Sequence, residues 1–228
     1  MTYDLIIIAA STSKELIRMT QQTIDSCRAE GDVRVILVET SPNVTVYDGV
    51  SKFVHYTEEF NYNGALNAGL KHRQGDVQIL ANNDLLFRKG WSEIGDLMRL
   101  NGYLSACALS NDFRQECFKR GDFAYEGYTI GFQMAGWCIF VDSKVWDVIG
   151  ELDTSHRFWF SDNVYVDQLK AAGISHALIC SVTVDHLGSK TLSTINGRAQ
   201  LLYTRDELRK YNAKRKGAEQ TIAKNLQT

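Results

Sequence analysis

The sequence predicts an α/β protein in which a mostly parallel central sheet is flanked by helices. Short apolar runs alternate with stretches of helical period, and clusters of polar residues follow several of these runs. The chain has 228 residues, of which 44% are hydrophobic and 23% charged, and this balance allows a sizeable core. No apolar stretch approaches the roughly 20 residues that span a bilayer, so no transmembrane segment is expected.

In the first hundred residues, short apolar runs typical of buried strands alternate regularly with stretches of helical period. The first expected strand is "YDLIIIAA", and Ser11 and Ser13 are candidate caps for the helix after it. The expected strands are 3–10, 33–39, 52–56 and 76–81, and the expected helices are 14–29, 63–73 and 90–100. This order is typical of a doubly wound sheet, where ligands bind outside the carboxyl ends of the strands.

After residue 101 the pattern is looser. Strands are expected at 103–109, 138–142 and 176–184, and helices at 143–149, at 162–172 and from about Leu192. The single proline, Pro42, and the lack of a linker or repeat indicate one domain, 1–228. Within it we expect a nucleotide-binding half (1–100), an acceptor-binding and catalytic half (101–190) and a C-terminal basic helix (191–228).

Charge is distributed unevenly along the chain. Residues 198–228 contain eight Lys or Arg against three Asp or Glu, which is +5, so residues 1–197 carry −7 of the total −2. A solvated amphipathic helix explains such a tail, and contact with an anionic partner is the alternative.

Five scattered cysteines, an odd number without Cys-x-x-Cys spacing, predict reduced and mostly buried thiols. No signal peptide is evident, so a cytoplasmic protein is expected, of a bacterium or a phage-infected host.

Polar residues gather where the fourth expected strand ends. Asn82, Asn83 and Asp84 follow that strand, at the edge of the expected ligand crevice. Just upstream, "FNYNGALNAGLKHRQGD" sets Asn63, Gly64, Asn67 and Gly69 at helical spacing, and a helix N-terminus attracts phosphate. Far downstream, "VDHLGSKT" ends another expected strand with His186. One carboxylate and one imidazole suit a divalent cation whose other ligands come from a diphosphate.

These segments resemble the family 2 glycosyltransferases of GT-A fold, the fold of nucleotide-diphospho-sugar transferases. The resemblance lies in "NYNGALNAGL", "LANNDLLF" and "KGW", and it extends from Leu5 to about Ser189. It implies that Asp84 and His186 bind Mn²⁺ or Mg²⁺ on the donor diphosphate. The implied donor-binding residues are Ala9, Ala10, Ser11, Glu39, Asn63, Gly64, Asn67 and Asn83.

The catalytic motif of that family is only partly present. Members carry Glu-Asp-x-Asp ahead of a helix, and this chain has "SDNV" there, so Asp162 falls on the general base. Ser161 and Val164 replace the two other carboxylates, which puts the orientation of the acceptor in doubt. Asp162 as a helix N-cap is the structural alternative. Trp159 and Phe160 are candidates to stack on the acceptor, although aromatics at this spacing also form cores.

The resulting hypothesis is a metal-dependent inverting glycosyltransferase. It would move a hexosyl or pentosyl group from a UDP-, dTDP- or GDP-sugar to an acceptor hydroxyl, first of all on a carbohydrate. Because of the basic tail, a bacteriophage-type enzyme that glycosylates hydroxymethylated bases in DNA is an alternative, although the pI of about 6.2 counts against it. A catalytically inactive GT-A module is a further alternative. A nucleotidyltransferase is disfavoured because "AASTSKEL" is not a Gly-rich phosphate loop.

Overall fold

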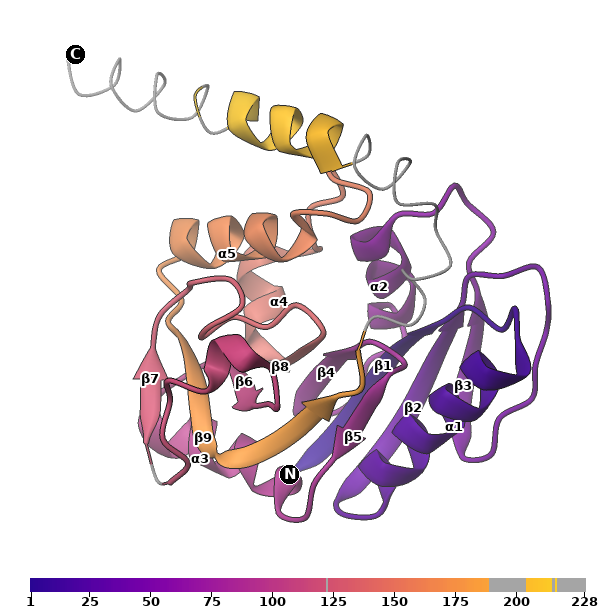
Figure 1. Ribbon diagram of the computed structural model, residues 1–228, viewed down its shortest axis with the longest axis horizontal. Coiled ribbons are helices and arrows are strands. Elements are labelled where there is room, and N and C mark those ends of the chain that lie inside the picture. Colours follow the sequence, from indigo (N-terminus) through magenta and orange to yellow (C-terminus); the bar gives the residue numbers. More distant parts are fainter. Residues whose placement is uncertain (122, 189–203, 215, 217–228) are drawn as a thin grey trace.

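The computed structural model describes residues 1–121, 123–188, 204–214 and 216. In this part of the chain, nine strands form one sheet in the order β3-β2-β1-β4-β8-β6-β9-β5, with β7 paired to β9. Helices flank the sheet, as Figure 1 shows, which confirms the predicted α/β class.

The four strands of the N-terminal half pair in parallel, as predicted. They are β1 (Thr2–Ala9), β2 (Asp32–Glu39), β3 (Val50–His55) and β4 (Val77–Ala81), connected through α1 (Lys14–Arg28) and α2 (Tyr62–Leu70). Ser13 is the N-cap of α1, because its Oγ accepts the Leu16 N–H at 3.2 Å. Ser11, the other candidate cap, instead hydrogen-bonds Glu39 at the end of β2.

The C-terminal half is mixed in direction. Strand β8 is antiparallel to β4 and β6, and β9 is parallel to β6 but antiparallel to β5 and β7. The mostly parallel pairing therefore applies to the first half only. Among the described residues between β6 and β8 there is no α-helix to provide the crossover that parallel neighbours require. The strands are β5 (Leu85–Phe87), β6 (Ser105–Leu109), β7 (Ala124–Glu126), β8 (Cys138–Asp142) and β9 (His176–His186).

The remaining helices are short. They are η1 (Trp91–Glu93), α3 (Ile94–Asn101), η2 (Phe113–Gln115), α4 (Lys144–Ile149) and α5 (Ser161–Ala171). Residues 204–214 form a further helix. The part of the predicted last helix from Leu192 to residue 203 lies outside the described residues, as do 217–228. The cysteines are free, and four of the five are buried.

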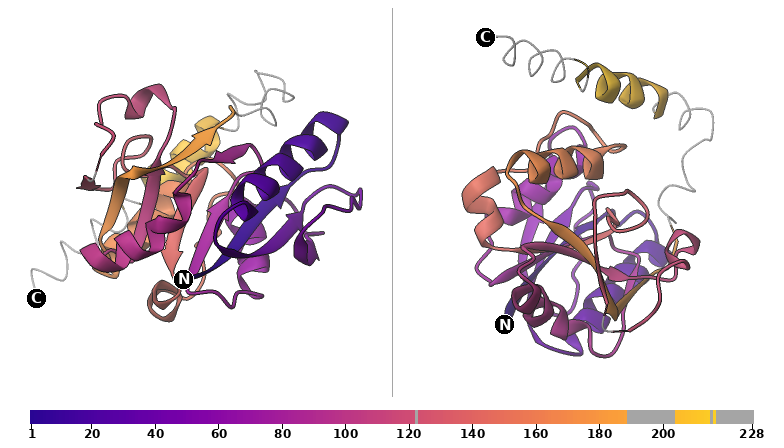
Figure 2. Two further views of the ribbon diagram at one scale, coloured as in Figure 1. Left: turned by 90° about the horizontal axis from the view of Figure 1, so that it is seen from below. Right: turned by 90° about the vertical axis from the view of Figure 1, so that its left-hand side faces the viewer.

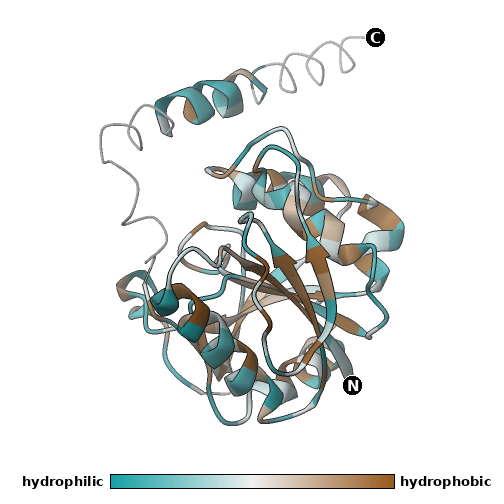
Figure 3. Cartoon of the chain, turned by 90° about the vertical axis from the view of Figure 1, so that its right-hand side faces the viewer, coloured by the Kyte–Doolittle hydropathy of each residue, from teal (hydrophilic) through white to brown (hydrophobic). Residues whose placement is uncertain are grey.

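Each face of the sheet has its own hydrophobic core. Side chains alternate along β1, so Leu5 and Ile7 join α1 and α3 on one face, whereas Ile6 and Ile8 join α2, α4 and α5 on the other. Figure 2 shows α1 and α3 on the same side of the sheet. In Figure 3 the strands inside the molecule are mostly hydrophobic, and hydrophilic residues alternate with hydrophobic ones along the helices.

Close packing of α2 on the sheet depends on Gly69. A Cβ at this position would lie 2.6 Å from Ile6 Cγ2 and 2.9 Å from Val38 Cγ2, both closer than real contacts. We expect Gly69→Ala to lower the free energy of unfolding by about 1–3 kcal/mol, because overpacking outweighs the better helix propensity of Ala. Urea unfolding measures this, and an unchanged or higher midpoint would contradict the packing argument.

A buried histidine should make stability depend on pH. His176 is 0% exposed, and its Nδ1 and Nε2 lie 2.8 Å from Ser105 Oγ and 3.1 Å from the Gln133 carbonyl oxygen. Burial lowers the pKa of His176 from 6.5 to about 4. Between these two values the unfolded chain binds more protons than the folded chain, so acid favours unfolding.

We therefore expect the His176 contribution to be fully present above pH 6.5 and lost as the pH falls towards 4, a total of about 3 kcal/mol. Urea titrations at pH 7 and pH 5 measure the slope. His176→Asn should be less stable at pH 7 but should show a smaller loss on acidification. The same slope in both proteins would assign the pH dependence to other groups.

Candidate active site

Strand pairing brings Asp84 and His186 together. After β4 the chain turns through 82–84 into β5, and β5 pairs with the end of β9, with Leu85 opposite His186. The Leu187 N–H donates to the Asp84 carbonyl at 2.8 Å, which closes the ladder beside the two side chains. As a result His186 Nε2 lies 3.1 Å from Asp84 Oδ2.

The two side chains fit a cation better than they fit each other. Although the distance suits an ion pair, His186 Nε2 and Asp84 Oδ1 are buried without a hydrogen-bond partner among the described residues. A buried carboxylate oxygen without a partner is costly, and a shared cation would satisfy both groups. No cluster of three or more His, Cys, Asp or Glu forms a metal site in the described part, so further ligands would come from substrate or water.

Neighbouring groups fix His186. Its backbone N–H donates to Asn111 Oδ1 at 2.9 Å, and its ring stacks on Trp137 with centroids 4.9 Å apart and planes 2° apart. Partners that hold a ligand's orientation influence metal affinity, so Asn111 and Trp137 belong to the candidate metal site.

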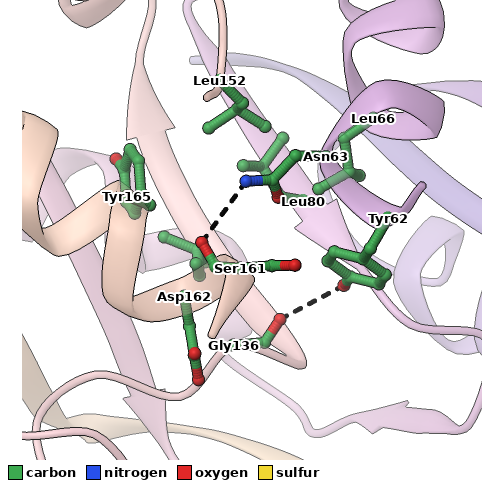
Figure 4. A pocket seen from close by; sticks show the side chains of 10 residues that line it. Tyr62, Asn63, Leu66, Leu80, Gly136, Leu152, Ser161, Asp162 and Tyr165 are labelled. Carbon is green, nitrogen blue, oxygen red and sulfur yellow. Dashed lines mark hydrogen bonds between the residues drawn. The ribbon is translucent and has the colours of Figure 1, made fainter. Parts of the chain in front are cut away.

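Tyr62 interacts electrostatically with both Asp84 and Asp162. Its hydroxyl donates to Asn82 Oδ1 at 2.8 Å and approaches the Gly136 carbonyl oxygen at 3.2 Å, a contact that Figure 4 shows. Burial, and then the negative charges of Asp162 and Asp84, raise the pKa of Tyr62 well above its usual range. Both predicted functional carboxylates therefore lie within electrostatic range of one phenol.

Asp162 occupies the first turn of α5. The N-cap of this helix is Phe160, so the alternative role of Asp162 as the N-cap is not what the structure shows. Burial raises the pKa of Asp162, and the Asn163 N–H, 2.9 Å from Oδ1, and the Arg114 charge oppose that rise. A Cβ at Gly136 would lie 3.0 Å from Asp162 Oδ2, so glycine is what allows the carboxylate to sit there.

Arg114 contributes a cation to the same region. It forms a bidentate pair with Asp112, Nε to Oδ1 at 2.9 Å and Nη2 to Oδ2 at 2.8 Å. Its guanidinium lies 5.6 Å from the centroid of Trp137, the ring that stacks on His186. No sequence pattern singled out Asn111, Arg114 or Trp137, and Tyr62 was not singled out within the helical segment that contains it.

The loop 152–160, which leads into α5, is held by amides of α2 and its cap. Asn67 donates to the Leu152 carbonyl at 2.8 Å and accepts the Leu152 N–H at 2.9 Å. Asn63 Nδ2 donates to the carbonyls of Asp153 at 2.8 Å and Ser161 at 3.3 Å, and the second bond is drawn in Figure 4. The two amides thus serve the loop in this structure, and their contact with the donor stays a prediction.

Figure 4 also shows how Asp162 points. Its carboxylate is directed away from Asn63 and Leu152, which line the other side of a small cavity. The cavity has a volume of about 10 Å³, which is room for about one water molecule. This gap separates α2 from α5 and is too small for a nucleotide sugar.

The other predicted donor residues lie at the carboxyl ends of β1 and β2 and around α2. Ser11 N–H donates to Glu39 Oε1 at 3.0 Å, and the Ser11 hydroxyl bonds the other Glu39 oxygen, while Ala9 and Ala10 precede it. Gly64 N–H donates to Asn61 Oδ1 at 2.8 Å in the cap of α2. Asn83 Nδ2 donates to Thr20 Oγ1 at 2.9 Å, which ties the turn to α1. Contact of these residues with a donor stays a prediction.

The two aromatic residues predicted for the acceptor differ in their surroundings. The Phe160 ring stacks on Tyr211 of the helix 204–214, with centroids 5.2 Å apart and planes 14° apart. Trp159 is partly buried and meets Phe158 edge-on at 5.1 Å. In this structure Tyr211 takes the place over Phe160 that a stacked acceptor would need, so Trp159 is the better candidate of the two.

Comparison with known proteins identifies the fold. No family model and no curated protein matches the sequence. The structure of GalNAc-T7 with UDP, GalNAc and Mn²⁺ matches with a TM-score of 0.61 and 10% identity, over 81% of this chain and 43% of that chain. S. aureus TarS 1–349 matches with a TM-score of 0.59 and 10% identity, over 82% of this chain and 60% of that one.

These neighbours have the GT-A fold, and the chain therefore has the GT-A fold of nucleotide-diphospho-sugar transferases, as its sequence predicted. The chain spans less than two thirds of the length of either neighbour. At this identity the likeness defines the fold and not the reaction. Among the described helices, none has the length and apolar character needed to cross a membrane.

Proposed function

We propose that this protein is a metal-dependent glycosyltransferase that moves a sugar from a nucleoside-diphosphate sugar to an acceptor hydroxyl with inversion. The observation that carries the proposal is the Asp84 and His186 pair, in which Asp84 Oδ1 and His186 Nε2 are buried without a hydrogen-bond partner among the described residues. Asp162, whose pKa is raised, and Asp84 both act electrostatically on Tyr62. The GT-A fold supports the proposal, and GalNAc-T7 was crystallised with a nucleotide, a sugar and Mn²⁺.

In this proposal Asp84 and His186 hold Mn²⁺ or Mg²⁺ at the donor diphosphate. The cation supplies Lewis-acid stabilisation of the charge that develops on the leaving group. The donor nucleotide would lie along the carboxyl ends of β1 and β2, near Ser11 and Glu39. Proteins with open α/β sheets bind their ligands at this edge of the sheet.

Asp162 acts as the general base. Its raised pKa makes the carboxylate a stronger base than an exposed Asp, while the Asn163 N–H and the Arg114 charge favour its ionised form. It takes the proton of the acceptor hydroxyl while the oxygen attacks the anomeric carbon and the bond to the phosphate oxygen breaks. One displacement of this kind inverts the configuration.

The acceptor is a carbohydrate hydroxyl in the first instance. Trp159 offers an aromatic surface near Asp162 on which a sugar ring can stack. Ser161 bonds the Phe158 carbonyl at 2.7 Å and so serves the turn where the family carries Glu, which leaves Asp162 as the base. DNA with a hydroxymethylated base stays a second acceptor to test, because exposed Arg205, Arg209 and Lys210 lie on the helix 204–214.

A donor screen tests the proposal. Protein with Mn²⁺ or Mg²⁺ is incubated with UDP-, dTDP- and GDP-sugars, and nucleoside diphosphate release is measured with and without EDTA. One donor should be hydrolysed or transferred only with the cation. Candidate sugars and hydroxymethylcytosine-containing DNA are then added, and a mass increase identifies the acceptor. Cation-dependent nucleotide binding without turnover of any donor would favour the inactive module, and no nucleotide binding would refute the proposal.

A further inference from the structure

The helix 204–214 docks on the loop that leads to Asp162. Glu207, Tyr211 and Lys214 are four and three residues apart, and they lie on one face of the helix. Glu207 is 2% exposed, and its Oε2 accepts the Arg157 N–H at 2.9 Å. Lys214 Nζ bonds the Asp153 carboxylate and donates to Ser155 Oγ at 3.2 Å. In Figure 3 most of this helix has the colour of hydrophilic residues.

Between these two polar anchors, Tyr211 covers an unusual backbone position. Phe160, the N-cap of α5, has φ 68° and ψ 9°, and it is the one non-glycine residue with positive φ in the described part of the chain. A left-handed conformation at such a residue costs on the order of 1–3 kcal/mol and persists only when the surroundings enforce it. Tyr211, 8% exposed, stacks on the Phe160 ring, and the His156 ring meets Phe160 at 6.3 Å.

The conformation of Phe160 determines where α5 begins. Its carbonyl accepts the Val164 N–H at 3.0 Å, the first bond of the helix, and Asp162 lies in that turn. If Phe160 relaxes to an ordinary φ, the first turn of α5 loses this geometry and the Asp162 carboxylate moves.

We infer that Tyr211 is a positioning residue, which acts through Phe160 to hold Asp162 where it can accept a proton. The helix 204–214 is then part of the catalytic unit, although none of its residues touches the reacting atoms. The inference rests on the proposed role of Asp162 as general base, but its structural part can be tested without any substrate.

The first test measures hydrogen exchange of the free protein. Tyr211→Ala should speed exchange of the Arg157 and Val164 amides at least tenfold, while the Ile79 amide in β4 stays unchanged. Tyr211→Phe keeps the stacked ring and should behave like wild type. The matched control is Leu208→Ala, on the exposed face of the same helix, where the side chain is 42% exposed.

The second test measures transfer. Tyr211→Ala should lower kcat at least tenfold while the donor KM changes less than twofold, and Tyr211→Phe should restore kcat. In the double variant with Phe160→Ala, Tyr211→Ala should cause little further loss, because both changes remove the same contact. Unfolding midpoints measured alongside show whether each variant is folded at the assay temperature.

The outcomes separate the two proposals. Faster exchange at 157–164 in Tyr211→Ala together with an inactive wild type would refute the glycosyltransferase proposal and leave the positioning of α5 supported. Unchanged exchange, or additive effects of Tyr211→Ala and Phe160→Ala on kcat, would overturn the role of Tyr211. A fall in donor affinity equal to the fall in kcat would also overturn it, because the helix would then act on donor binding.

Discussion

Asp162→Asn is expected to slow sugar transfer at least about 100-fold while donor affinity stays nearly unchanged, since a general base contributes roughly 10²- to 10⁴-fold. The amide is the same size and its oxygen can still accept the Asn163 N–H, so the first turn of α5 is preserved. Single-turnover rates and donor titrations measure the two quantities separately. Equal losses in rate and in donor affinity would assign Asp162 a structural role.

Two further measurements sharpen this prediction. Because the folded pKa of Asp162 is raised, ionisation of this group opposes folding at pH 7, so Asp162→Asn should unfold at the same or a higher urea concentration. The acid limb of the wild-type pH profile should report a pKa above 3.8 and should disappear in the variant. Asp167→Asn, a partly buried carboxylate on the same helix, is the matched control and should transfer at the wild-type rate.

Asp84→Ala is expected to abolish the cation dependence of nucleotide binding. Donor affinity should fall at least about 10- to 100-fold, because mutation of a residue that only orients a metal ligand already lowers metal affinity by this factor. Calorimetry with UDP, Mn²⁺ and EDTA measures both effects. Tight nucleotide binding by the wild type that EDTA does not weaken would show that Asp84 holds no cation.

The stability of the metal-free Asp84→Ala variant shows whether Asp84 is a metal ligand or a structural carboxylate. Asp84 Oδ1 is buried and has no partner among the described residues, so its removal should not destabilise the protein in the absence of metal. The control is Asp185→Asn, next to His186 in β9, whose carboxylate pairs with Arg88. This variant should bind nucleotide and cation as the wild type does. A large loss of stability in metal-free Asp84→Ala would indicate a structural role.

The regular elements were predictable because each buries a periodic apolar face. β2 and β8 were expected at 33–39 and 138–142 and lie at Asp32–Glu39 and Cys138–Asp142. β5 and β7 were not expected, because a strand of three residues carries too little alternation to be recognised. The direction of the strands could not be predicted either. The antiparallel pairing of β8 with β4, and of β5 with β9, depends on which strands meet in space.

The candidate site was predictable only where a motif marked it. Asp84 and His186 were named from a resemblance, and the structure places them 3.1 Å apart through the β5 and β9 pairing. Asn63 and Asn67 were expected at the nucleotide, but in the structure their amides bond the loop 152–160, because a buried amide must satisfy its donors and acceptor locally. Arg114 and Trp137 were not predicted, since cation and ring come together only in three dimensions.

The anchors of the loop 152–160 have a consequence for how the protein can change. Asn61 donates to the carbonyls of Thr154 and His156, and Asn67 and Glu207 bond the main chain at Leu152 and Arg157. These contacts involve the backbone, which every amino acid shares, so they do not require a particular side chain at 159. Phe158 differs, because its ring packs on Tyr62 with centroids 5.9 Å apart. A library randomised at position 159 alone is therefore a route to new acceptor preferences that leaves the anchors of the loop, and with them the base, in place.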